Sequence, residues 1–161
     1  MGSGILPVAY HKGNVHILLG KEVEDKKWSD FGGASEGTET TFETAIREGY
    51  EELNGFLGAK SKLRKRVRDY MLTKISEVTY TTYVFQIDYD ERLPIYFNDY
   101  SKFVKERLPH LINKRGLFEK SEIQWFSINE LRKIKDRLRP FYKTIVENII
   151  NQEKYLLSLI K

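Results

Sequence analysis

Short, dense runs of apolar residues occupy much of the first ninety positions and predict β-strands. Residues 5–10 and 15–19 form two such runs, and the polar stretch between them contains Gly13 and Asn14, a pair typical of tight turns. We therefore expect a hairpin there. Residues 72–78 and 80–89 are rich in β-branched and aromatic side chains, which favour strands, and they form a second expected pair.

Apolar residues recur with helical spacing in three other places. The first is residues 40–54. The second begins at a cap formed by Asn98 or Asp99 and runs toward Pro109, which is expected to kink or break the helix because it lacks an N–H donor. The third covers residues 140–160. These spacings predict three helices in addition to the strands.

The remaining segments are shorter. Residues 21–27 are mostly charged and predict a loop. Residues 122–126 read as a short strand, and Ser127 with Glu130 makes a capping box that should open a helix directly after it. Strands paired as hairpins and separated by helices favour an α/β fold, a layered α/β/α sandwich with a mixed sheet.

Composition limits the classes of protein to consider. The chain of 161 residues fits a single domain over residues 1–161, and 40% hydrophobic residues argue against disorder. The absence of cysteine excludes a disulfide framework and a thiolate site. No apolar run resembles a signal peptide or a membrane span, so we expect a cytoplasmic protein without a membrane partner.

The net charge of +4 directs attention to residues 60–68, where lysine and arginine are concentrated. This run fits either a short basic helix within residues 60–70 or a charged loop. A basic patch attracts polyanions such as RNA, but it is equally an ordinary solvated helix face. The sequence leaves both alternatives open.

The helix expected over residues 40–54 separates its side chains into two faces. At about 100° per residue, its apolar residues fall on one stripe, whereas Glu48, Glu51 and Glu52 cluster on the opposite side. Like charges at this spacing repel one another by a few tenths of a kcal/mol per pair. A hard divalent cation, which takes oxygen ligands and shares them with substrate phosphates, fits the cluster better than a lone lysine does.

A glycine-rich approach precedes the helix, and the combined spacing resembles the Nudix box. The pattern in that family is Gly-x5-Glu-x7-Arg-Glu-aliphatic-x-Glu-Glu-x-Gly-aliphatic. The matching charged residues and leading glycine stand at the required spacing: Gly33, Glu39, Arg47, Glu48, Glu51 and Glu52.

Three positions depart from the pattern. Gly49 and Gly55 stand where aliphatic residues are usual, and Asn54 stands where glycine is usual. Asn54 can still end the helix in the left-handed conformation. We interpret Gly49, in the middle of the apolar stripe, as a point of close approach to the sheet beneath.

The resemblance implies an α/β/α fold and a metal site. It implies that Mg²⁺, or Mn²⁺ as a substitute, is held by Glu48, Glu51 and Glu52 together with the carbonyl of Gly32. Arg47 would orient a carboxylate, and Glu39 would support it from a second layer around the metal. Residues 28–31 match a short strand that leads into the metal loop.

Candidates outside the motif are less sharply defined. In several family members the base is the counterpart of Glu48 or a glutamate from a loop. Here Glu119 and Glu122 are the candidates for an additional base or ligand, and each is equally well explained as solvent-exposed.

Three aromatic residues, Tyr10, Trp28 and Phe31, could stack a nucleobase, although aromatic residues near strands more often belong to the core.

These observations favour an Mg²⁺-dependent Nudix pyrophosphohydrolase that cleaves a diphosphate linkage in a nucleoside diphosphate-X compound. The basic run favours large polyanions, including capped RNA 5′ ends, and hence mRNA decapping. Free nucleotides, dinucleoside polyphosphates and diphosphoinositol phosphates are alternative substrates. A non-catalytic Nudix-fold module that binds a nucleotide or RNA is the alternative from another class. The sequence does not indicate an oligomeric state.

Overall fold

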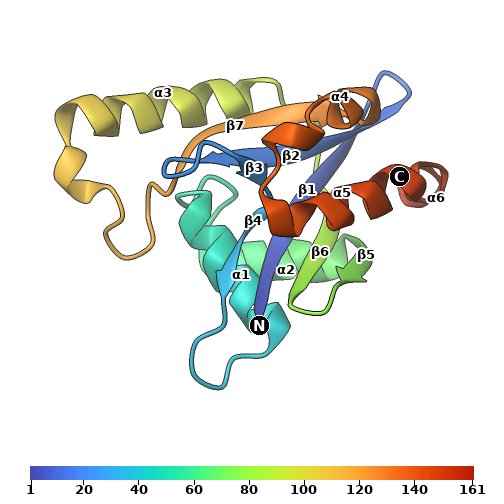
Figure 1. Cartoon of the computed structure of the whole chain (residues 1–161), viewed down its shortest axis with the longest axis horizontal. Helices are drawn as coiled ribbons and strands as arrows, with labels where there is room; N and C mark the ends of the chain where they lie inside the picture. The colour runs from blue at the N-terminus through green and yellow to red at the C-terminus, as the bar shows by residue number, and fades with distance from the viewer.

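The computed structural model describes residues 1–161 as a mixed β-sheet with helices on both faces (Figure 1). In chain order the elements are β1 (Gly2–His11), β2 (Asn14–Glu22), β3 (Trp28–Ser29), β4 (Phe31–Ala34), α1 (Thr41–Glu52), α2 (Lys60–Asp69), β5 (Met71–Ser76), β6 (Tyr80–Gln86), α3 (Arg92–Arg107), the 3₁₀ turn η1 (Pro109–Leu111), β7 (Lys120–Ser127), α4 (Ile128–Lys133), the 3₁₀ turns η2 (Lys135–Arg137) and η3 (Pro140–Tyr142), α5 (Lys143–Asn151) and α6 (Glu153–Leu159).

The sheet is organised around β1. The strand order is β3-β2-β1-β6-β5, and β4 and β7 pair with β1 and β2 respectively. Only the β1–β6 pair is parallel. Along its other edge, β1 pairs with β4 over residues 2–5 and with β2 over residues 8–11. Pro7 lies at this change of partner, where its missing N–H costs no ladder hydrogen bond.

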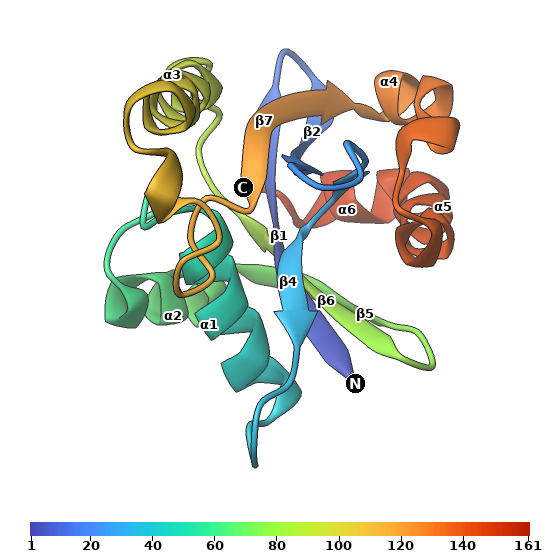
Figure 2. The ribbon, with the colours of Figure 1, turned by 60° about the vertical axis from the view of Figure 1, so that its left-hand side comes forward.

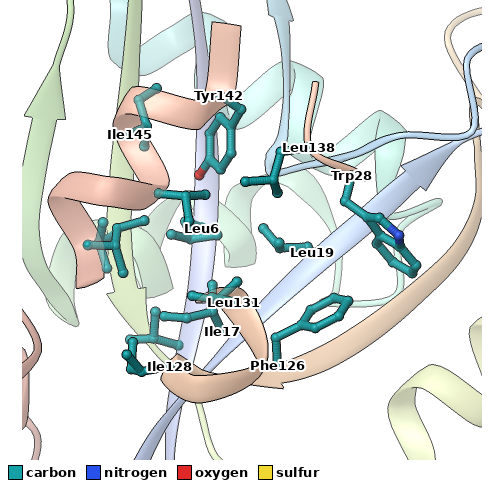
Figure 3. Packing of buried hydrophobic residues seen from close by; sticks show 14 of the residues in the cluster. Leu6, Ile17, Leu19, Trp28, Phe126, Ile128, Leu131, Leu138, Tyr142 and Ile145 are labelled. Atoms are coloured by element: carbon teal, nitrogen blue, oxygen red, sulfur yellow. The ribbon is translucent and has the colours of Figure 1, made fainter. Parts of the chain in front are cut away.

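Two apolar clusters pack against the two faces of the sheet. Alternate residues of the central strands point to opposite faces, so Leu6 and Val8 join one cluster whereas Ile5 and Ala9 join the other. Because both faces are covered, β1 has an unbroken apolar run at residues 5–9 and β2 has one at residues 17–19. Figure 3 shows the first cluster, in which Leu6, Ile17 and Leu19 of the strands meet side chains from the C-terminal helices.

The helices divide between the two faces. Figure 2 shows the sheet nearly edge-on, with α1, α2 and α3 on one side and α4, α5 and α6 on the other. The expected α/β/α sandwich with a mixed sheet is therefore confirmed. None of the helices combines the length and apolar composition that crossing a membrane requires.

The expected hairpins form, with small shifts at their ends. The first turn is Lys12-Gly13, one residue earlier than predicted, because His11 pairs with Asn14 and both turn residues have positive φ. The charged segment 21–27 was predicted to be a loop, but β2 continues through Glu22. Residues 60–69 form the helix α2, which settles the alternative that the sequence left open.

The prediction that Asn98 or Asp99 caps a helix was wrong. Helix α3 begins at Arg92, with Pro94 in its first turn, where a missing N–H leaves no hydrogen bond unmade. Asn98 instead lies inside the helix, and its side-chain amide bonds both the N–H and the C=O of Ile123. The helix ends at Arg107, and Pro109 opens a separate 3₁₀ turn.

The C-terminal helical pattern is interrupted in two places. A 3₁₀ turn occupies Pro140–Tyr142, and Gln152 separates α5 from α6. The capping box at Ser127 and Glu130 forms as expected and opens α4.

Candidate functional site

Helix α1 presents its acidic face next to β4. A capping box between Thr40 and Glu43, which the sequence analysis overlooked, fixes its first turn. Gly49 faces β1, and a Cβ there would meet Cγ1 and Cδ1 of Ile5 at 2.5 Å. The expectation that Gly49 marks a close approach to the sheet is therefore confirmed, and the helix lies low enough for its carboxylates to face β4.

Six carboxylates line one open pocket of about 580 Å³, which we call the carboxylate pocket. They come from α1, from the loop before it, from the end of β2 and from the segment before β7: Glu22, Glu36, Glu48, Glu51, Glu52 and Glu119. Gly32 and Gly33 of β4 form another wall. Gly33 leaves room for Glu48, because an added Cβ would meet its carboxylate at 2.6 Å and displace it.

Arg47 is the main counter-charge inside this group. Its Nε lies 2.8 Å from Glu39 and its Nη1 lies 2.9 Å from Glu48, and Nη2 also donates to Glu39 and to the carbonyl of Ala34. Glu51 is 3.6 Å from Nη1. The guanidinium thus fixes Glu39 and Glu48 in place, which agrees with the orienting role that the resemblance implied.

Glu52 is held separately from the others. It is almost fully buried, and its Oε1 accepts a hydrogen bond of 2.6 Å from the N–H of Gly32. The ammonium group of buried Lys120 lies 4.0 Å from Glu52 and 3.8 Å from Glu22. The N–H and C=O of one strand residue point to the same edge, so the carbonyl of Gly32 also faces this side of β4.

The loop between η1 and β7 lies beside the end of α1 (Figure 2), and its residues Arg115, Gly116 and Glu119 line the carboxylate pocket. Asn54 has left-handed backbone geometry, with φ of 51°, and its side-chain oxygen accepts a 2.9 Å hydrogen bond from the N–H of Phe118. The carbonyl of the next residue, Glu119, accepts from the N–H of Val23 at 2.9 Å. These two bonds anchor the segment that carries Glu119.

The carboxylates resist ionisation where they crowd together. Burial raises the pKa of Glu48, Glu51, Glu52 and Glu119, and neighbouring carboxylates raise all four further. Glu39 behaves in the opposite way, because hydrogen bonds from Arg47 lower its pKa to about 2. In the lining of the pocket, six carboxylates stand against the three arginines Arg47, Arg115 and Arg139.

This donor set fits a hard divalent cation. All its ligand atoms are oxygens, from carboxylates and from the backbone of β4, and such atoms suit Mg²⁺ and Mn²⁺ rather than softer metals. No three acidic or histidine side chains form a ready-made cage, since Arg47 and Lys120 occupy part of the space between them. Among the expected ligands, Glu48, Glu51 and Glu52 line the pocket, and the Gly32 carbonyl faces the same side of β4.

The loop candidates separate clearly. Glu119 lines the carboxylate pocket, but Glu122 does not. Glu122 forms an ion pair with Lys21, its partner across the β2–β7 pair, and lines a different cavity. The prediction of Glu122 as a base or ligand is therefore corrected. Although Glu122 lies only two residues from Lys120 on β7, its carboxylate is paired with Lys21.

The three aromatic candidates for base stacking are also corrected. Trp28 and Phe31 are 6% and 0% exposed and belong to the two apolar clusters, so neither offers a free ring face. Tyr10 is exposed, but it pairs with Val15 at the hairpin end of β1. It lies six residues beyond Gly4, the partner of Gly32, which is roughly 20 Å along the strand.

Several residues at the pocket had not been predicted. Glu22 ends β2, and Arg139 follows η2 and lies 3.3 Å from Glu22. Arg115 lines the same pocket from the loop before β7. Each lies far in the sequence from the motif on α1, and only the tertiary fold brings them together. No pattern in the neighbouring sequence predicted that they would reach the pocket.

No protein-family model and no curated protein matches the chain. Solved structures do match. The Ap4A hydrolase of C. elegans, solved as a binary complex, has a TM-score of 0.57 at 13% identity, with 92% of this chain and 95% of that chain covered. A Nudix hydrolase from M. smegmatis has a TM-score of 0.54 at 14% identity, with 96% and 86% covered.

A third match is the bifunctional NMN adenylyltransferase/ADP ribose pyrophosphatase of Francisella tularensis, complexed with AMP and a Mn ion. Its TM-score is 0.56 at 16% identity, and the match covers 93% of this chain and 41% of that chain. At such identities the similarity concerns the fold. The chain has the fold of the Nudix hydrolases.

Proposed function

We propose that this chain, which has the Nudix hydrolase fold, is a divalent-metal-dependent pyrophosphohydrolase that cleaves a diphosphate linkage in a nucleoside diphosphate-X compound. The observation that carries the proposal is the convergence of Glu48, Glu51 and Glu52 with Glu119 around one open pocket beside the backbone of β4. The structural neighbours include hydrolases named for Ap4A and ADP-ribose, which contain such linkages.

The pocket supplies what cleavage of a diphosphate requires. Its phosphoryl oxygens repel nucleophiles, so an enzyme must neutralise their charge and position water. When bound, Mg²⁺ clamps phosphate oxygens and lowers the pKa of coordinated water. Arg47 keeps Glu48 oriented toward the pocket. Glu119, whose pKa is raised by burial and by neighbouring acids, is suited to accept a proton from water.

Cationic residues at the pocket are suited to bind the substrate. Arg115 forms no ion pair with a carboxylate within 4.0 Å, and it lines the pocket next to Gly116, which lies against Glu51. Its guanidinium can therefore bind phosphate oxygens without first breaking an ion pair. Arg139, which already contacts Glu22 and Asp25, would instead shape the acidic wall.

Glu51→Gln tests this proposal. The variant removes one anionic ligand while keeping the side-chain shape, so Mg²⁺-dependent hydrolysis should fall by at least about 100-fold, because metal catalysis supplies several kcal/mol. Substrates to assay are ADP-ribose, dinucleoside polyphosphates, nucleoside triphosphates, diphosphoinositol phosphates and capped RNA, with identification of the products. Undiminished hydrolysis by the variant would contradict the assignment.

Glu43→Gln is the matched control. Glu43 lies on the same helix but does not line the pocket, and glutamine preserves its role in the capping box. This variant should hydrolyse substrate at the wild-type rate. Circular dichroism and thermal melting of both variants separate a loss of ligand from a loss of fold.

A capped RNA 5′ end is a second candidate substrate, and α2 is the observation that favours it. Five basic side chains of this helix are exposed: Lys60, Lys62, Arg64, Lys65 and Arg68. Burial raises the pKa of Glu51, and Lys60 is close enough to oppose that rise. If RNA lies along α2, its affinity should fall steeply with salt. The slope of the logarithm of the association constant against the logarithm of the salt concentration should be roughly −0.7 to −0.9 for each phosphate contact. A flat salt dependence would favour free nucleotides.

A further inference from the structure

A second cavity, of about 550 Å³, lies on the other side of the segment that leads into β7. We call it the lysine pocket. Its walls come from α3, from residues 21–26 and from the start of β7. Neighbouring residues of the chain face the two cavities, since Phe118 lines the lysine pocket whereas Glu119 lines the carboxylate pocket.

The lysine pocket has uncompensated positive charge. Five lysines line it: Lys21, Lys26, Lys102, Lys105 and Lys120. Lys21 is paired with Glu122, and Lys120 is paired with Glu22 and Glu52. The other three lysines have no carboxylate within 4.0 Å, and Asp99 is the one further acid in the lining. Several ammonium groups around one cavity repel each other, and an anion bound among them would relieve that repulsion.

The inner surface of the lysine pocket is mostly apolar. Val23, Ile112 and Phe118 contribute to it. Phe118 is only 7% exposed and packs edge-on against Tyr100, but unlike Trp28 and Phe31 it lines a cavity. The hydroxyl oxygen of Ser101 is buried in this lining and has no hydrogen-bond partner, although buried polar atoms nearly always have one. A ligand with a flat ring, hydrogen-bonding groups and a negative charge matches all three features. A nucleotide has this combination.

The two cavities adjoin a third. This smaller cavity of about 350 Å³ shares Val23 with the lysine pocket. It shares Glu22, Glu119 and Arg139 with the carboxylate pocket. A molecule with its diphosphate at the carboxylate pocket would pass Val23 to reach the lysine pocket. The volume of the lysine pocket lies within the range of ligand-binding cavities.

We propose that the lysine pocket is a second nucleotide subsite, which binds the nucleotide moiety beyond the cleaved diphosphate. This inference specifies the substrate of the proposed function, and the identity of the group bound in the lysine pocket rests on that function. It narrows the substrate to compounds in which X is itself a nucleotide. Lys102 and Lys105 bind the phosphate of that moiety, and the ring packs on Phe118 with a hydrogen bond to Ser101.

Binding of AMP to the metal-free, full-length protein tests this subsite without requiring hydrolysis. AMP is titrated in the presence of EDTA, and binding is followed by ¹H–¹⁵N NMR. Amide shifts are expected at Val23, Ser101, Ile112 and Phe118. The double variant Lys102→Ala/Lys105→Ala should bind AMP about tenfold more weakly or worse, because it loses two charged contacts.

Lys133→Ala/Lys143→Ala is the matched control. It removes two lysines from α4 and α5, on the other face of the sheet, where both side chains are exposed and neither lines the lysine pocket. This control should bind AMP as the wild type does. Ribose 5-phosphate, which has the phosphate but no base, should bind more weakly than AMP. Equal weakening in both double variants, or equal affinity for the two ligands, would overturn the subsite.

The outcome separates this inference from the proposed function. If the wild type hydrolyses no diphosphate but AMP shifts the lysine-pocket amides, the subsite stands and the proposed function fails. If hydrolysis is intact but AMP shifts only the amides of the carboxylate pocket, the subsite fails and the proposed function stands. Glu51→Gln should retain AMP binding while losing hydrolysis, because Glu51 does not line the lysine pocket.

Discussion

At the scale of single residues, Arg47 governs the charge balance of the carboxylate pocket. Its guanidinium contacts Glu39, Glu48 and, at a longer distance, Glu51. Because a planar guanidinium can hold two carboxylates at once, it suppresses repulsion that a single ammonium group could not. Arg47 thereby keeps Glu48 in position even though burial raises the pKa of that residue.

The ionisation of Glu39 measures this contact directly. Hydrogen bonds from Arg47 lower the pKa of Glu39 from 4.5 to about 2, so Glu39 stabilises the folded state above its unfolded pKa and loses that contribution as pH falls toward 2. A ¹³C NMR titration of the side-chain carboxyl should show this midpoint. In Arg47→Lys the midpoint should move upward, because lysine cannot form the paired hydrogen bonds. Equal midpoints in both proteins would contradict the role of Arg47.

The sequence could predict the site residues that lie within one stretch of chain. The acids of α1 share one helix face, so their spacing alone placed them together. Glu22 and Arg139 join them only through the order of the strands, which local spacing does not encode. Trp28 and Phe31 were misassigned for a related reason. Helices cover both faces of the sheet, so a side chain on either face is buried.

At the scale of elements, the position of α1 depends on its contact with β1. Gly49→Ala should destabilise the protein by about 1–3 kcal/mol, because the new Cβ would meet the side chain of Ile5, which is fully buried and cannot move aside. Helix propensity alone predicts the opposite, a gain of about 1 kcal/mol. Urea unfolding distinguishes these signs.

Ile5→Ala supplies the matching partner for a double-mutant cycle. It removes Cγ1 and Cδ1, which would leave Cβ at 3.6 Å from the added methyl group. Alone it should cost about 2–5 kcal/mol. The double variant should cost less than the sum of the two single variants, whereas simple additivity would show that Gly49 does not face Ile5.

The junction between α1 and the loop before β7 gives a second prediction at this scale. Asn54→Gly keeps the left-handed backbone but loses the acceptor for the N–H of Phe118, whereas Asn54→Asp keeps an acceptor. Hydrogen exchange of the Phe118 amide should accelerate about fivefold in the glycine variant, as expected for a bond of ~1 kcal/mol. The aspartate variant should retain protection. Equal exchange rates of the Phe118 amide in the wild type and both variants would contradict this anchoring role.

Elements were predictable where local chemistry determines them. The capping box at Ser127 and the apolar hairpins needed no tertiary information. The start of α3 was missed because Pro94 and the charged residues before it read as the end of a strand, although proline is tolerated in a first helical turn. Asn98, taken for a cap, has a tertiary role in binding the backbone of β7.

At the scale of the whole molecule, the sheet assembles one site from distant segments. The end of β2, the backbone of β4, helix α1 and the loop before β7 meet around the carboxylate pocket. The two cores on either face of the sheet hold these elements in place. The central claim is that this assembly, and no other part of the surface, binds a divalent ion.

Paramagnetic broadening by Mn²⁺ measures that claim most directly. Substoichiometric Mn²⁺ is added to the ¹⁵N-labelled protein, and the loss of ¹H–¹⁵N signal is mapped along the chain. Broadening should centre on the amides of Gly32, Gly33, Glu48, Glu51 and Glu52, and Glu51→Gln should weaken it. Broadening centred elsewhere, or broadening that Glu51→Gln leaves unchanged, would contradict the account.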